Sequence, residues 1–511
     1  MLDKGNDMNV LVIWGHPRKD SYCAALAKEY IRGAKEAGVN IESLVLADMR
    51  FEMSVVVPSP EDQHMEDDIL KAQEWIKWAD HLVFVFPTWW GNMPALLKAF
   101  LDRVLTPGFA FREIQPDAFN KLLSPRTAQL IATMDTPVLI DRLFNGAPAT
   151  KSLTNATLKF CGVKPVRKML LSPIKHSTDE KKQQWLREVY QKGRNLERGV
   201  LTPWEKFKKK ITPWIQAVRL QFYPMTFFAY GIGAFAFSKL NGDFNILVFV
   251  LGYILLFLME VIVVFSNDYY DRETDRLNRF YSPFSGGSRV LINGLISESA
   301  LKKAMKILFF ISCVLTAVVA FLSAAVFHQV VLMVAVLFLI AISYTAPPLK
   351  FSYRGWGEVV VGFTHSFAVI LCGFVFQGGS MGVILPWLLG IPLFLSIIPA
   401  IIMGGVPDFA ADKQAGKGTL AVRLGKNRAA YFAVFFVLLS VISIFFLKES
   451  DYLDEVYGNI IYLAIIHAFW LLSMLYKFIR TEKKPNRIDG IMAVSLSYIM
   501  WFALVPFIKL A

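Results

Sequence analysis

The sequence predicts a chain of two parts: a soluble α/β domain with a doubly wound parallel sheet, followed by an all-α membrane domain with nine transmembrane helices. Short apolar runs alternate with helical patterns over about the first 190 residues, which is typical of an α/β sheet. Apolar segments of membrane-spanning length fill most of the remainder. Two acidic clusters, which begin at Asp268 and Asp408, interrupt this apolar part. A chain of 511 residues has room for two or more domains.

Charge is spread unevenly along the chain. Residues 1–200 contain 27 Lys and Arg and 24 Asp and Glu, whereas residues 201–511 contain 27 and 17. The positive surplus therefore lies mainly in the apolar part. This pattern favours membrane topology and phosphate binding, and we expect no nucleic acid partner, because no soluble basic stripe is interleaved with stacking aromatics.

The cysteines and the N-terminus indicate a cytoplasmic first domain. The four cysteines have no paired metal-ligand or redox spacing, and we expect ordinary buried thiols in a reducing compartment. The first residues lack the apolar core and small-residue cleavage site of a secretory signal.

The expected α/β elements follow the chain in order. Residues 10–14 form a short apolar run, a polar loop covers 15–21, and a helical pattern covers 24–37. In a doubly wound sheet the ligand crevice lies at the carboxyl ends of the strands. Further strands are expected at 41–46, 81–86, 130–133 and 166–171, with a helix at 67–78.

A basic and aromatic segment separates the two parts. Residues 196–219 contain a run of lysines flanked by Trp204 and Trp214. Lysine meets anionic headgroups and tryptophan favours the membrane interface, so we expect either an interfacial helix or a solvated linker. The expected domains are therefore 1–195, 196–219 and 220–511.

Nine segments of the second part are long enough to span a bilayer. With a cytoplasmic start, the loops after the second, fourth, sixth and eighth segments hold nearly all the loop lysines and arginines. The positive-inside rule then places both acidic clusters on the cytoplasmic side. The expected spans are 221–239, 244–266, 305–326, 328–346, 358–377, 383–404, 428–447, 457–477 and 490–508.

The acidic clusters predict a shared metal site. Asp268, Asp271 and Asp275 recur at helical spacing, as do Asp408 and Asp412. Carboxylates held this close at a membrane edge repel one another unless a cation lies between them. A hard divalent cation such as Mg²⁺ takes oxygen ligands and bridges to phosphate.

The loops of the first part resemble the flavodoxin-like NAD(P)H:quinone oxidoreductase family. The resemblance rests on Gly15-His-Pro with Ser21, and on Phe86-Pro-Thr-Trp-Trp-Gly-Asn-Met-Pro-Ala-Leu-Leu-Lys98. It implies FMN or FAD as cofactor, NADH or NADPH as reductant, and a homodimer. Met134-Asp-Thr-Pro137 stands where better-known members have a Gly-Gly pair, so the choice of flavin stays open. The implied flavin-binding residues are His16, Ser21, Tyr22, Cys23, Pro87, Thr88, Trp89, Trp90, Thr133, Met134 and Asp135.

The second part resembles the UbiA superfamily of intramembrane aromatic prenyltransferases. Asn267-Asp-x-x-Asp-x-x-x-Asp275, Tyr344-Thr-Ala-Pro-Pro-Leu-Lys350 and Pro407-Asp-Phe-Ala-Ala-Asp412 carry this resemblance. The loop at 282–291 is similar to the dihydroxynaphthoate branch, although Ser282 stands where many relatives have arginine.

The resemblance implies a role for each group of residues. Asn267, Asp268, Asp271, Asp275, Asp408 and Asp412 would hold Mg²⁺, and the five aspartates would be catalytic. Lys350, Arg354, Lys417 and Arg423 are candidates for the diphosphate, and Tyr344, Tyr353 and Glu358 for the acceptor or the allylic cation.

The two parts together predict a bifunctional enzyme of quinone biosynthesis, of menaquinone type. A prenyl cation attacks electron-rich rings, so reduction of a quinone by the first part would keep the acceptor or product reduced. Alternative acceptors are 4-hydroxybenzoate, homogentisate or a lipid alcohol. An alternative function of the first part is that of a regulatory or quinone-sensing module without turnover. A further alternative for the protein is a transporter.

Overall fold

The computed structural model describes all residues except 1–7, 116–117, 283, 450 and 483. Pro283 of the naphthoate-like loop and Lys483 of the last basic loop therefore lie outside the described residues. The chain divides into two compact units, residues 1–206 and 207–511.

The first unit contains a five-stranded parallel sheet with the strand order β2-β1-β3-β6-β7. Every residue of β3 and β6 is buried, which fits their central position and their apolar sequences. The five expected strands are confirmed. Their bounds are β1 Asn9–Trp14, β2 Asn40–Val45, β3 His81–Pro87, β6 Thr127–Thr133 and β7 Val166–Leu171.

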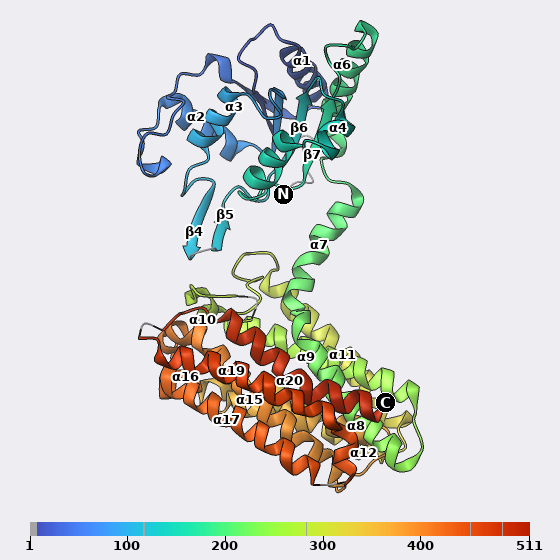
Figure 1. Cartoon of the computed structure of the whole chain (residues 1–511). Helices are drawn as coiled ribbons and strands as arrows, with labels where there is room; N and C mark the ends of the chain where they lie inside the picture. The colour runs from blue at the N-terminus through green and yellow to red at the C-terminus, as the bar shows by residue number, and fades with distance from the viewer. Residues whose placement is uncertain (1–7, 116–117, 283, 450, 483) are drawn as a thin grey trace. The chain divides into compact units, whose positions relative to one another are not determined.

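Helices cover both faces of this sheet (Figure 1). One face packs against α1 Tyr22–Glu36 and α6 Asp179–Arg194. The other packs against α2 Asp67–Trp78 and α3 Ala95–Val104. Two short helices, α4 Val138–Leu143 and α5 Pro148–Lys151, follow β6. An antiparallel hairpin, β4 Phe111–Gln115 and β5 Ala118–Lys121, was not expected from the sequence.

The second unit consists of helices joined by loops, with no strand among its described residues (Figure 1). Seven helical segments among those residues are long and apolar enough to cross a membrane. These spans are α9 Ile246–Tyr270, α11 Glu298–Leu322, the segment Gly357–Phe376, α15 Leu385–Gln414, α17 Lys426–Lys448, the segment Asn459–Arg480 that contains α19 Leu463–Arg480, and α20 Asp489–Leu510.

The two other expected spans form shorter or less apolar helices. They are α8 Tyr223–Asn241 and α12 Phe327–Ile342, which have 19 and 16 residues. The basic segment between the units is also helical, as α7 Pro203–Val218. The remaining short helices are α10 Arg272–Leu277, α13 Gly357–Phe363, α14 Val369–Phe376, α16 Leu420–Leu424 and α18 Asp451–Tyr457.

Two glycines permit a close helix crossing in the second unit, between α8 and α14. A Cβ atom added to Gly233 would lie 1.8 Å from the Ile370 carbonyl oxygen, and one added to Gly373 would lie 2.0 Å from the Tyr230 carbonyl oxygen. Backbone cannot move aside as a flexible side chain can, so only glycine allows the two helices this contact.

Gly373→Ala is therefore expected to destabilise the membrane domain by about 3 kcal/mol or more, because its methyl group meets backbone. The measurement is the thermal unfolding midpoint in detergent. Gly404→Ala is the matched control, since its Cβ would meet only the Met492 Cε atom, at 3.6 Å. Equal midpoints for the two variants would contradict the proposed packing constraint.

Candidate active site

A cavity of about 310 Å³ lies where α9 and α15 end, and it is lined by residues of several helices. The two acidic clusters, well over a hundred residues apart in the sequence, meet at this cavity. Tyr344, Glu358 and Lys417 also line it. All six expected metal ligands are among the lining residues: Asn267, Asp268, Asp271, Asp275, Asp408 and Asp412.

The first acidic cluster is shaped by a break between two helices. Helix α9 ends at Tyr270, Asp271 is its C-cap, and α10 starts at Arg272. A loop then folds back over the cluster. The Ser288 backbone N–H donates to Asp268 Oδ1 at 3.0 Å, and the Ser288 hydroxyl donates to Asp268 Oδ2.

Gly287 permits this loop to approach the carboxylates. Its φ of +68° is in the left-handed region, and an added Cβ would lie 2.0 Å from Asp275 Oδ2. Asp275 itself is half-buried, and burial followed by repulsion from Asp271 and Asp268 raises its pKa well above the usual value. The first cluster therefore holds more negative charge than its surroundings compensate.

Lys417 is the cation that lies among these carboxylates. Its Nζ atom is 2.8 Å from Asp271 Oδ2 and 4.0 Å from Asp412 Oδ1. Burial lowers the pKa of this ammonium, but Asp271, Tyr344 and Asp412 together outweigh burial, and the pKa is raised well above its usual value. Tyr353 donates from its hydroxyl to Asp271 Oδ1 at 2.9 Å, and burial raises the pKa of Tyr353 to about 12. Asp271 thus accepts hydrogen bonds from two donors, the charged Lys417 ammonium and the neutral Tyr353 hydroxyl.

Other polar groups fix the second cluster and the floor of the cavity. Asn278 Nδ2 donates to Asp408 Oδ1 at 2.6 Å, and Thr345 Oγ1 donates to Asn267 Oδ1 at 2.6 Å. Glu358 Oε1 accepts from the Leu420 backbone N–H at 2.8 Å, while its buried Oε2 has no hydrogen-bond partner.

The donor chemistry of the cavity fits Mg²⁺, because every candidate ligand offers oxygen. Within the described part of the chain, no three His, Cys, Asp or Glu side chains are grouped as a ready-made metal site. The hydrogen bonds and the ion pair just described explain this spacing, since Asp268, Asp271 and Asp408 each bind a neighbouring side chain.

Three of the expected diphosphate ligands do not line the cavity. The Arg354 guanidinium donates to the Pro348 carbonyl, and Arg423 donates to the Gly418 and Arg354 carbonyls, so both arginines tie loops together. Lys350 lies over the ring of Tyr353, at 5.1 Å. Lys417 is thus the member of the four predicted diphosphate-binding side chains that lies among the carboxylates.

Sequence reasoning missed Arg219, which lines the same cavity. It precedes α8 and adopts a left-handed conformation with φ of 58°. The sequence signal for Arg219 was its position, at the end of the basic linker and directly before the first apolar segment. Glu260, for which no role was predicted, also lines the cavity, as does His365, which was expected to be structural because it has no metal-like spacing to other histidines.

In the first unit, the expected flavin residues follow three adjacent strands. His16 follows β1, Thr88 and Trp89 follow β3, and Thr133 ends β6, so their loops meet at one edge of the sheet. The rings of His16 and Trp89 meet edge to face, with centroids 5.4 Å apart. The pKa of His16 is lowered by burial and by Arg18.

Several features of this edge fit a planar cofactor with a phosphate. Trp90 is fully exposed, and the buried Thr88 hydroxyl has no hydrogen-bond partner. Ser21 caps the N-terminus of α1 by accepting from the Ala24 N–H, and helix N-termini favour anions. Pro87 ends β3, and Met134 binds the Leu171 carbonyl through its backbone N–H.

Other expected flavin residues bind within the protein. The Tyr22 hydroxyl donates to the Lys182 carbonyl at 2.8 Å, and the Cys23 sulfur is 3.3 Å from Thr133 Oγ1. Asp135 Oδ1 accepts from the Lys175 backbone N–H at 2.7 Å. Burial raises the pKa of Tyr22 to about 12 and that of Cys23 to about 11. These groups position the crevice loops.

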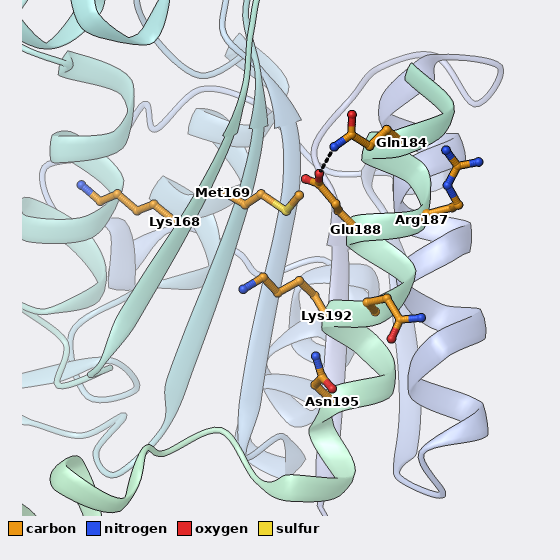
Figure 2. A pocket seen from close by; sticks show the side chains of 8 residues that line it. Lys168, Met169, Gln184, Arg187, Glu188, Lys192 and Asn195 are labelled. Carbon is orange, nitrogen blue, oxygen red and sulfur yellow. Dashed lines mark hydrogen bonds between the residues drawn. The ribbon is translucent and has the colours of Figure 1, made fainter. Parts of the chain in front are cut away.

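A second, open hollow of the first unit lies between β7 and α6 (Figure 2). Met169 and Lys192 border it, and Gln184 donates to Glu188 Oε1 at 2.9 Å across one turn of α6. None of the expected flavin residues lines it.

The fold and the sites together define a class of protein: a soluble α/β domain joined to a helical membrane unit that contains a carboxylate-lined cavity. Residues 225–496 match the UbiA prenyltransferase family, and residues 8–192 match the family described as flavodoxin-like fold. The chain belongs to the UbiA prenyltransferase family. It is a fusion of a flavodoxin-like NAD(P)H quinone oxidoreductase domain with a UbiA prenyltransferase domain, and it is an integral membrane protein with about seven candidate spans.

Individual relatives resemble one half or the other. An uncharacterized NAD(P)H oxidoreductase of Haemophilus influenzae is 29% identical over 34% of this chain and 88% of its own length. Digeranylgeranylglyceryl phosphate synthase of Methanocaldococcus jannaschii is 26% identical over 55% of this chain and 89% of its own. The 1,4-dihydroxy-2-naphthoate octaprenyltransferase of Escherichia coli is 25% identical over 42% of this chain and 70% of its own.

Removing the buried ammonium tests the electrostatics of the cavity. Lys417→Met leaves Asp271 and Asp412 without their cation, so we expect a loss of about 3 kcal/mol of stability in the presence of a chelator. Mg²⁺ should restore part of this loss, because a divalent cation supplies the missing positive charge. Thermal unfolding with and without Mg²⁺ measures both effects.

The control for this measurement is Lys426→Met. Lys426 does not line the cavity and donates to Asn486 Oδ1 instead. If Lys417→Met unfolds at the wild-type temperature in chelator, the ammonium does not hold the carboxylates together.

Proposed function

We propose that the membrane domain transfers a prenyl group from a prenyl diphosphate to an aromatic, hydroquinone- or naphthoate-like acceptor, in a menaquinone-type pathway. The N-terminal domain would reduce a quinone with NADH or NADPH through FMN or FAD. The observation that carries the proposal is the convergence of five aspartates and one buried lysine on a single cavity at the ends of two apolar helices.

The cavity residues divide into three roles. Asn267 and the five aspartates would hold Mg²⁺, which neutralises charge on the departing diphosphate when bound. Lys417 would exchange Asp271 for a diphosphate oxygen, since its ammonium is already placed among the ligands. Tyr344 and Tyr353 would face the allylic cation, and Glu358 would orient the acceptor. Lys350, Arg354 and Arg423 stay predictions as diphosphate ligands.

The topology and assembly are part of the same proposal. Nine spans, including α8 and α12, would place the N-terminal domain and both acidic clusters on the cytoplasmic side. The segment 196–219 would lie at the membrane surface. A homodimer formed through the N-terminal domain stays a prediction.

A second candidate acceptor is a lipid alcohol. The observation in its favour is that the glyceryl phosphate synthase aligns with more of this chain than the naphthoate transferase does. The acceptors 4-hydroxybenzoate and homogentisate, and a regulatory N-terminal domain without turnover, also stay open. Mass analysis of lipids formed from Mg²⁺, a prenyl diphosphate and defined acceptors distinguishes these functions.

The two activities should be separable by mutation. Asp408→Asn is expected to reduce prenyl transfer by at least about a hundredfold, as loss of an electrostatic stabiliser does in other enzymes. Quinone-dependent NAD(P)H oxidation should be unchanged. Trp89→Ala should have the opposite effect, with slower quinone reduction and normal transfer to an acceptor that is already reduced. Loss of both activities in either variant would contradict two separate sites.

The redox state of the acceptor should control prenyl transfer. With an oxidised quinone acceptor under anaerobic conditions, transfer is expected only when NAD(P)H is present, because the oxidised ring is a poor nucleophile. A chemically reduced acceptor serves as the control and should need no NAD(P)H. Equal rates with and without NAD(P)H for the oxidised acceptor would contradict this coupling.

A further inference from the structure

Two ionisable residues lie deep in the carboxylate cavity, in the middle of membrane-spanning segments. Glu260 of α9 and His365 of the segment Gly357–Phe376 both line the cavity. Glu260 is seven residues before Asn267, and His365 is seven residues after Glu358, so each helix places the pair about 10 Å below the metal-binding level. Ionisable groups at such depth are costly and generally serve a function.

The two side chains face each other at the distance of an ion pair. His365 Nε2 is 3.7 Å from Glu260 Oε1, beyond hydrogen-bond range. The other carboxylate oxygen, Oε2, accepts from the Thr226 hydroxyl at 2.8 Å. Thr226 thus fixes the orientation of the Glu260 carboxylate, and Oε1 faces His365.

The backbone determines which nitrogen of His365 carries a proton. Nδ1 lies 3.1 Å from both the Val361 carbonyl oxygen and the Thr364 hydroxyl oxygen. The carbonyl can only accept, and the Thr364 hydroxyl donates to the Val360 carbonyl at 2.9 Å, so both contacts are satisfied when Nδ1 carries the proton. In the neutral ring Nε2 is then an acceptor. Two acceptors, Nε2 and Glu260 Oε1, therefore converge on the cavity, and a ligand that brings a hydroxyl proton would satisfy one of them.

The local backbone is adapted to this geometry. Residues Thr364–Ala368 form a π-helical turn, which adds one residue to the turn and changes the direction of the side chains there. Such turns inside α-helices occur often at functional sites.

A prenyl tail does not explain this pair. With a neutral His365 ring, an apolar chain beside the pair would leave Nε2 and Glu260 Oε1 without a hydrogen-bond donor. The neighbouring lining residues Val264, Val361 and Ile401 are apolar and suit a ring or a chain. A polar group on an otherwise apolar ligand matches this combination.

We propose that Glu260 and His365 bind the hydroxyl group of the prenyl acceptor and take up the proton that transfer releases. This inference rests on the proposed prenyl transfer. The C–O bond of the prenyl diphosphate breaks and its electron pair leaves with pyrophosphate. An acceptor carbon supplies the electron pair of the new C–C bond, and the hydroxyl proton passes to His365 Nε2. The proton on that carbon then moves to the oxygen and restores the aromatic hydroxyl. With a lipid alcohol, the hydroxyl oxygen itself forms the new bond and its proton follows the same route.

A binding experiment with the full chain in lipid nanodiscs tests the pair. Mg²⁺ and a prenyl thiodiphosphate, which reacts slowly, fill the donor site. The acceptor probes are 1,4-dihydroxy-2-naphthoate and its dimethyl ether, and a second arm uses a glyceryl phosphate lipid and its O-methyl derivative. Wild type should bind one hydroxyl compound at least about tenfold more tightly than its ether, as expected for a hydrogen bond to a charged group.

Glu260→Gln and His365→Gln should remove this preference and leave thiodiphosphate binding unchanged, which also shows that the variants fold. His467→Gln is the matched control, because this intramembrane histidine does not line the cavity and binds Trp501 Nε1. An unchanged preference in both dyad variants overturns the proposal, as does a wild type without preference in either arm. A wild type that binds with the expected preference but transfers no prenyl group contradicts only the proposed function.

Discussion

Mutual repulsion among buried carboxylates is the constraint on which the membrane domain depends. Five aspartates from two distant parts of the chain line one cavity, and Lys417 is the ammonium placed between them. The Ser288, Asn278 and Tyr353 side chains satisfy individual oxygens but add no positive charge. The same excess of negative charge that costs stability suits the cavity to the proposed binding of Mg²⁺ and diphosphate.

The cavity has two polar levels separated by apolar lining. Carboxylates lie at the helix ends, and Glu260 with His365 lies about two turns deeper. This arrangement suits substrates with a charged head on one side and a hydroxyl on the other. The glycine contacts between α8 and α14 keep neighbouring helices close and rigid. A binding site needs that rigidity, because its side chains must be held within fractions of an ångström of the productive geometry.

Fusion places two chemistries with a shared requirement on one chain. Prenyl transfer to an aromatic acceptor needs an electron-rich ring, and the proposed flavin-dependent quinone reduction would produce one. The strand-end loops with Trp89, Trp90 and Thr88 provide exposed aromatic surface and an unsatisfied buried hydroxyl at the edge where such sheets bind ligands. A single chain also fixes the ratio of the two domains at one to one.

The sequence by itself determined the two-part architecture, the five parallel strands and the acidic clusters, because period, segment length and helical spacing are local properties. Only the tertiary structure decided which charges meet. Lys417 reaches Asp271 while Arg354 and Arg423 bind loop carbonyls, although all three were equal candidates in the sequence. The pairing of Glu260 with His365 was equally invisible, since contacts between distant helices depend on packing and not on local pattern.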